Sequence, residues 1–181
     1  MFIFLILLAA ILVALLRGGS LMRFAELEIR WSGLFIAGFL LQVLVFADFW
    51  QTRDVLRQFT PLAYLASLAL VLVALLVNRH IPGIVLLGLG FFSNALVIAL
   101  NGGFMPASPS ALTIAGLPPL APGQTSNNSI GMSPDTRLWF LGDIFAIPRG
   151  LPFPNIFSIG DVLIAIGAVY LIQRVMVQPA K

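Results

Sequence analysis

The sequence contains no cysteine and only one histidine among its 181 residues. Without cysteine the chain cannot form a disulfide, an iron–sulfur cluster, a thioether-linked haem or a thiolate zinc site. One histidine cannot supply both axial ligands of a bis-histidine haem. The sequence also lacks a glycine-rich phosphate loop and a serine–histidine–aspartate set. We therefore expect no cofactor and no metal.

Charged residues are scarce as well. They make up 9% of the chain, whereas hydrophobic residues make up 60%, and the mean hydropathy is +1.04. A soluble domain carries about 25% charged residues, so this chain has too few to cover a surface in water. The ten lysines and arginines are scattered singly and form no basic face for nucleic acid. We therefore expect the lipid bilayer, and not a nucleic acid, to be the main partner.

Five apolar stretches are long enough, or nearly so, to cross about 30 Å of hydrocarbon at about 1.5 Å per helical residue. They cover residues 1–16, 31–50, 61–77, 82–100 and 159–177. The sequence thus predicts an all-α integral membrane bundle that forms a single domain over the whole chain. Residues 101–155, which are rich in proline, glycine, serine and asparagine, form a long outer loop between spans four and five. Within this loop, residues 138–147 are too short to span and favour an interfacial or re-entrant helix.

The orientation follows from the basic residues, which are more frequent on the cytoplasmic side of membrane proteins. The more basic side carries six of them: Arg17, Arg23, Arg30, Arg79, Arg174 and Lys181. The other side carries four: Arg53, Arg57, Arg137 and Arg149. This places the N-terminus and the 101–155 loop outside and the C-terminus in the cytoplasm.

Close helix packing is indicated by small residues four positions apart, which let helices approach one another in lipid. Such pairs are Ala10/Ala14, Gly33/Ala37, Ala63/Ser67 and Ala95/Ala99.

Two aspartates in apolar surroundings are the candidates for chemistry. Ser158 and Asp161 fit a variant of the capping box, in which Ser158 is the N-cap and Asp161 reaches back from the third helical position. Asp143 has two readings. It is either a loop carboxylate bonded to local amides, Arg137 or Arg149, or the partner of Asp161. Two adjacent carboxylates cannot both ionise, so such a pair provides an acid and a base that activate water. That role requires their oxygens to lie within hydrogen-bond distance or to share one water.

The remaining polar candidates are structural. Ser93 and Asn94 lie in the middle of the fourth span, where interhelical hydrogen bonding is the default role and an ion or substrate path is the alternative. Asn101 begins the Asn-Gly-Gly sequence that ends this span.

Three stretches together resemble an uncharacterised family of small bacterial multi-pass membrane proteins. They are Asn101-Gly-Gly-Phe-Met-Pro-Ala-Ser-Pro, Thr136-Arg-Leu-Trp-Phe-Leu-Gly-Asp-Ile and Phe157-Ser-Ile-Gly-Asp-Val-Leu-Ile-Ala-Ile-Gly. The resemblance implies a bacterial origin and a multi-pass fold, and it brings no activity.

A fainter resemblance is to lipoprotein signal peptidase, an aspartyl protease of the membrane surface. Residues 157–161, Phe-Ser-Ile-Gly-Asp, are similar to the motif that opens the last helix of that enzyme. The resemblance implies that Asp161 and Asp143 are catalytic. The sequence departs from the enzyme's second motif, because no arginine directly follows Asp143.

Three functions follow from these features. The absence of a cofactor ligand set and of a complete catalytic motif favours a small non-catalytic accessory subunit that packs within a larger membrane complex. The alternative is a membrane-surface aspartyl hydrolase that uses Asp143 and Asp161. A second alternative is a small-solute transporter, which predicts a water-filled cavity that reaches Ser93 and Asn94.

Overall fold

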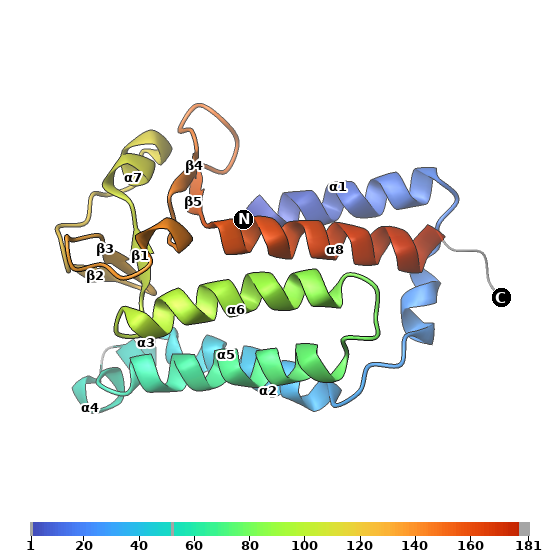
Figure 1. Cartoon of the computed structure of the whole chain (residues 1–181), viewed down its shortest axis with the longest axis horizontal. Coiled ribbons are helices and arrows are strands. Elements are labelled where there is room, and N and C mark those ends of the chain that lie inside the picture. Colours follow the sequence, from blue (N-terminus) through green and yellow to red (C-terminus); the bar gives the residue numbers. More distant parts are fainter. Residues whose placement is uncertain (1, 52, 178–181) are drawn as a thin grey trace.

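A computed structural model describes residues 2–51 and 53–177 of the chain. Lys181 and the side chain of Arg57, which entered the charge argument, lie outside the described residues. Five long helices lie side by side (Figure 1). They are α1 (Phe2–Leu16), α2 (Ser32–Val45), α5 (Thr60–Val77), α6 (Ile84–Leu100) and α8 (Ile159–Val177). The neighbours follow the order α1, α8, α6, α5, α2, so the last helix packs between the first helix and α6.

Two of these helices, α5 and α8, are long and apolar enough to cross a membrane, while α1, α2 and α6 are shorter apolar helices. The second predicted span is too long, because α2 ends at Val45 and the chain then turns into α3 (Asp48–Gln51) and α4 (Asp54–Arg57). At about 1.5 Å per residue, α2 and α6 extend about 21 and 26 Å.

The outer surface of the helices is apolar. Large hydrophobic side chains are exposed on each long helix, for example Leu12, Phe39, Leu62, Phe92 and Ile166. The core helices of a water-soluble protein would bury most such side chains, and contiguous exposed apolar patches mark a contact with a membrane or a partner. The helices therefore bury only part of their apolar surface against one another.

The all-α prediction is wrong for the segment between α6 and α8. Here the chain forms the five short strands β1 (Met105–Ala107), β2 (Thr125–Ser126), β3 (Ser129–Gly131), β4 (Phe145–Ile147) and β5 (Asn155–Phe157). β3 lies between β1, to which it is parallel, and β2, to which it is antiparallel, while β4 and β5 form an antiparallel pair. Strands of two or three residues are too short to produce a detectable alternating pattern.

We call residues 101–157 the cap. It also contains the helix α7 (Pro109–Ala115) and the 3-10 helix η2 (Trp139–Leu141). The predicted interfacial helix over residues 138–147 is therefore only the short η2 followed by β4. The cap lies at the end of the helices where α1 begins (Figure 1). The link with the 3-10 helix η1 (Leu21–Glu26) and the α5–α6 hairpin lie at the opposite end.

A buried asparagine in the hairpin fixes this opposite end. The Asn78 side-chain amide donates to the backbone oxygens of Arg30 and Ala74, at 2.7 and 2.8 Å. Its Oδ1 accepts from the Arg30 backbone N–H at 2.8 Å. Because Arg30 lies two residues before the start of α2, Asn78 sets where α2 begins relative to α5.

Glycines bring α6 and α8 close together. A Cβ atom on Gly90 would collide with the backbone oxygen of Gly160, and one on Gly83 would collide with that of Gly167. The predicted small-residue pairs missed this contact. Of those pairs, Ala10 and Ala14 are buried against α8, whereas both members of Gly33/Ala37 are exposed. The close approach of α6 and α8 places Asn94 opposite Asp161.

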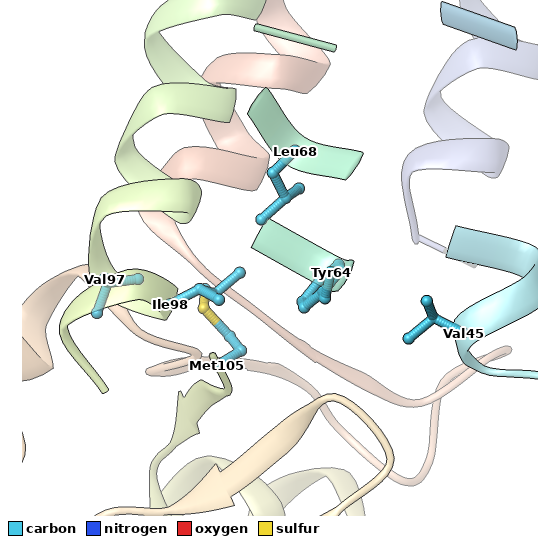
Figure 2. Packing of buried hydrophobic residues seen from close by; sticks show 6 residues of the cluster. All are labelled: Val45, Tyr64, Leu68, Val97, Ile98 and Met105. Carbon is cyan, nitrogen blue, oxygen red and sulfur yellow. The ribbon is translucent and has the colours of Figure 1, made fainter. Parts of the chain in front are cut away.

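One hydrophobic cluster joins the cap to the helices. Figure 2 shows its members: Val45, Tyr64, Leu68, Val97, Ile98 and Met105. Met105 belongs to β1 and contacts this cluster from the cap side. The first strand of the cap is thereby held against α5 and α6.

Candidate functional site

Asp161 lies in the first turn of α8, where the predicted capping box is present. The Asp161 backbone N–H donates to Ser158 Oγ at 3.0 Å, and the Ser158 backbone N–H donates to Asp161 Oδ2 at 2.9 Å. These two bonds satisfy donors that a helix start leaves unpaired. The carboxylate also lies at the positive end of the helix dipole.

Asn94 of α6 extends this network across the helix interface. Its Nδ2 donates to Asp161 Oδ1 at 3.0 Å. Ser158 Oγ lies 2.9 Å from both Asn94 Oδ1 and Asp161 Oδ2, and its one proton serves one of them at a time. Asn94 therefore has an interhelical role, and both Asp161 oxygens are held by donors.

Asp143 is positioned by its backbone. Its backbone N–H donates to the Pro106 backbone oxygen at 2.8 Å, and its backbone oxygen accepts from the Ser108 N–H at 3.0 Å. It also forms a parallel bridge with Ala107 of β1. Burial raises the pKa of the Asp143 carboxyl from 3.8 to about 7, and the nearby charge of Asp161 contributes to this increase. Within the described part of the chain, no ion pair joins Asp143 to Arg137 or Arg149.

Both aspartates line one cavity of about 810 Å³ between the cap and the helices. Its other polar lining side chains are Gln42, Tyr64, Asn94, Ser126, Asn127, Asn128, Ser129 and Asn155. None of the described residues that line it is basic. The volume is within the range of about 300–1,000 Å³ that is usual for small-molecule sites. The cavity therefore presents two carboxyl groups without a cationic side chain to neutralise them.

The cavity wall is apolar on the helix side. Each of the five long helices contributes at least one residue, such as Ile3 from α1, Leu68 from α5, Phe91 from α6 and Ile164 from α8. No hydrogen bond joins the Asp143 and Asp161 carboxyl groups directly among the described residues. The two acids thus share a cavity rather than a hydrogen bond, and a water or reacting group is needed to connect them.

The other predicted polar residues have separate positions. Asn101 accepts the Arg137 N–H at 3.0 Å and donates to the Arg137 oxygen at 2.9 Å, so it fixes the chain before η2. Ser93 Oγ is buried without a hydrogen-bond partner, and Ser93 does not line the cavity. Only Asn94 of the pair predicted for a transport path reaches the cavity.

A family model described as a family of unknown function (DUF5317) matches residues 26–173. The chain belongs to this family. The DUF5317 region contains α2, α5, α6, the cap and most of α8, including both aspartates, whereas α1 precedes it. No curated protein and no solved structure matches the chain.

Within the DUF5317 region, sequence reasoning missed most of the polar residues that line the cavity, including Tyr64, Asn128 and Asn155. Tyr64 is buried in α5, and its hydroxyl is hydrogen-bonded to the side chain of Asn128, the residue before β3. Asn155 enters the cavity from β5. Tyr64 was detectable as a polar group within an apolar helix, which marks a functional or packing position in membrane proteins. The two cap asparagines carried no such signal, since they lie in a polar segment.

Proposed function

We propose that the chain is a multi-pass protein of a bacterial cytoplasmic membrane, with five spans and the cap on the outer side. The exposed apolar faces of all five helices support this arrangement. So does the charge distribution, because Arg17, Arg30 and Arg79 lie at the end opposite the cap. The shorter helices are accommodated by local thinning of the bilayer. This costs only fractions of a kcal/mol per Å of difference between helix length and hydrocarbon thickness.

The absence of native cysteine allows a direct test of this topology. Ser126→Cys in the cap and His80→Cys in the hairpin each introduce one thiol at an exposed site. A membrane-impermeant maleimide should label Ser126→Cys on intact cells and His80→Cys only after permeabilisation. Labelling of His80→Cys on intact cells would contradict the orientation.

We further propose that the cavity is a hydrolytic site at the outer membrane surface, with Asp161 as the base and Asp143 as the acid. The observation that carries this proposal is the placement of both carboxyls on one cavity in different environments. Asp161 is held by donors from Ser158 and Asn94, whereas the pKa of Asp143 is raised to about 7. An acid that keeps its proton beside a hydrogen-bonded carboxylate provides the two roles of acid–base catalysis.

The reaction is hydrolysis of an ester or amide. Asp161 accepts a proton from water as the water oxygen bonds to the carbonyl carbon, and Asp143 gives its proton to the carbonyl oxygen. The resulting diol then collapses as the bond to the leaving group breaks. The leaving group takes the proton held by Asp161, and a diol hydroxyl returns a proton to Asp143. The pair is thereby restored to its starting state.

The test uses the purified protein in detergent with p-nitrophenyl acetate and p-nitrophenyl palmitate. Asp143→Asn and Asp161→Asn should each lower kcat by about 100-fold or more, because general acid–base catalysis contributes about 10²–10⁴-fold. Asp135→Asn, at an exposed cap aspartate, is the matched control and should hydrolyse both esters at the normal rate. Wild-type rates in the two site variants, or no hydrolysis of either ester by the unsubstituted protein, would reject this function.

A second candidate, the accessory subunit, is favoured by the arrangement of the helices. The two outermost helices, α1 and α2, pack mainly against α8 and α5 respectively, so each leaves a large face without a partner in the chain. Such faces suit association with other membrane proteins. Extraction in a gentle detergent should then yield the chain in a larger complex of fixed composition, whereas an isolated active monomer would contradict this candidate.

A further inference from the structure

The inner half of α1 is firmly attached to α8. Ala10 and Ala14 are buried in a cluster with Ile172 and Met176 of α8. The Gln173 side chain donates to the Ala10 backbone oxygen at 2.7 Å and accepts from Arg17 Nη1 at 2.7 Å. These contacts all lie in the half of the helix pair that is remote from the cap.

The same two helices leave space between them that extends from Gln173 to Val162, near the cap. A groove of about 410 Å³ is lined by Ile6, Val162, Ala165, Ile166, Val169, Tyr170 and Gln173. One turn from Ile6, Ile3 of α1 lines the carboxylate cavity, as does Ile164, which directly precedes Ala165. The groove and the cavity therefore take lining residues from neighbouring positions of α1 and α8.

The groove has the chemistry of an acyl-chain site. Its lining is aliphatic apart from Tyr170 and Gln173. Both the nitrogen and the oxygen of the Gln173 amide already form hydrogen bonds within the chain. Water would find few hydrogen-bond partners there. A partner helix, at about 10 Å across, is too wide to enter a groove of this size between two packed helices. Ile166 and Tyr170 are exposed, so the groove opens toward the surroundings of the helices.

We propose that the substrate is an amphiphile that enters from the lipid between the outer halves of α1 and α8. Its acyl chain occupies the groove, and its ester or amide lies in the cavity beside Asp143 and Asp161. This inference rests on the proposed hydrolytic function, and it adds the substrate class and the route of entry. The described residues of α1 that are buried are Ala10 and Ala14. Local opening is easiest where few contacts are buried, so the two helices part most readily on the cap side of Ala10.

The kinetic test uses a substitution whose larger side chain fills the groove. Ala165→Phe should lower kcat/KM for p-nitrophenyl palmitate about tenfold, because excluding even two methylenes from an apolar site has about this effect. Because p-nitrophenyl acetate has no long chain to place in the groove, the ratio of kcat/KM for palmitate to that for acetate should fall about tenfold in this variant. Ala66→Phe, at an exposed position of α5 outside both cavities, is the control and should change neither rate.

A binding test does not depend on hydrolysis or on the folding of Ala165→Phe. Palmitic acid with a diazirine near the end of its chain is photolysed with the Asp143→Asn protein in phosphatidylcholine vesicles. Crosslinks should concentrate at Ile6, Val169 or Tyr170, and a probe with the diazirine near the carboxyl should reach Ile3 or Ile164.

The outcomes separate the two proposals. If crosslinks form in both the groove and the cavity but neither ester is hydrolysed, the hydrolytic function is wrong and the lipid route is supported. If the esters are hydrolysed, Ala165→Phe affects palmitate no more than acetate, and the crosslinks spread evenly over exposed positions such as Phe39 and Leu62, the lipid route is wrong. Crosslinks that join the grooves of two copies would assign the groove to a protein interface and also overturn the lipid route.

Discussion

The raised pKa of Asp143 gives a quantitative prediction about stability. A shift from 3.8 to about 7 is about 3 units, and each unit corresponds to about 1.36 kcal/mol. Because the folded state holds the proton more tightly than the unfolded state, stability falls as the pH rises through this window. The loss begins near pH 4 and is complete above about pH 7, where ionised Asp143 destabilises the fold by about 4 kcal/mol.

Asp143→Asn removes this titration while keeping the backbone bonds that hold the residue to β1. The free energy of unfolding of the variant, relative to that of the unsubstituted protein, should therefore increase by roughly 2.5 kcal/mol between about pH 5 and pH 8. Denaturant unfolding in detergent at several pH values measures this difference, with Asp135→Asn as the control. A difference that does not change with pH would refute the reasoning.

Infrared spectroscopy tests the same group directly. The carbonyl stretch of a protonated carboxyl should be present in the unsubstituted protein at about pH 6, absent from Asp143→Asn, and lost as the pH rises through about 7. The proposed hydrolysis should slow over the same range, because Asp143 in the proposed role of general acid works only while protonated. Titration of Asp143 near its ordinary pKa would remove both the stability effect and the acid.

Three other substitutions test the frame around the site. Gly90→Ala should destabilise the fold by about 1–3 kcal/mol, since its methyl group would meet Gly160, whereas Gly33→Ala, with open space around it, should be neutral or slightly stabilising in thermal unfolding. Ser158→Ala should cost about 1 kcal/mol by loss of the N-cap, and Ser158→Thr should restore most of it in the same assay. Asn78→Ala should cost about 2–4 kcal/mol in denaturant unfolding, because three backbone groups each lose a hydrogen bond to the amide. Full stability in that variant would show that water replaces the amide.

The sequence predicted the features that depend on long local patterns. The apolar runs located α5 and α8 closely, and the spacing from Ser158 to Asp161 predicted the capping box because both partners lie within one helical turn. The end of α2 was predicted too late, because the apolar pattern continues past the turn at Phe46. The strands of the cap were missed because each is too short to show a period.

The composition of the cavity depends on contacts between distant segments, which no local pattern encodes. Asn94 and Asp161 are 67 positions apart, and they meet because glycines on α6 and α8 allow the helices to approach closely. Tyr64 and Asn128 meet because the cap folds back over α5. The separation of Asp143 and Asp161 along the chain could neither predict nor exclude a shared cavity.

The side chain of Asp161 has a structural role, whereas that of Asp143 has none among the described contacts. Asp143 is therefore the stronger evidence for a functional site. The Asp161 side chain caps α8 and binds Asn94, so helix stability alone accounts for it. Asp143 is attached to the cap through its backbone, which any residue with a backbone N–H provides. Its carboxyl is mostly buried beside a second carboxylate, and it lowers the stability of the fold above about pH 7. A side chain that costs stability and supports no described structural contact is explained by a role toward a ligand or substrate, so the case for a functional cavity rests on Asp143 more than on Asp161.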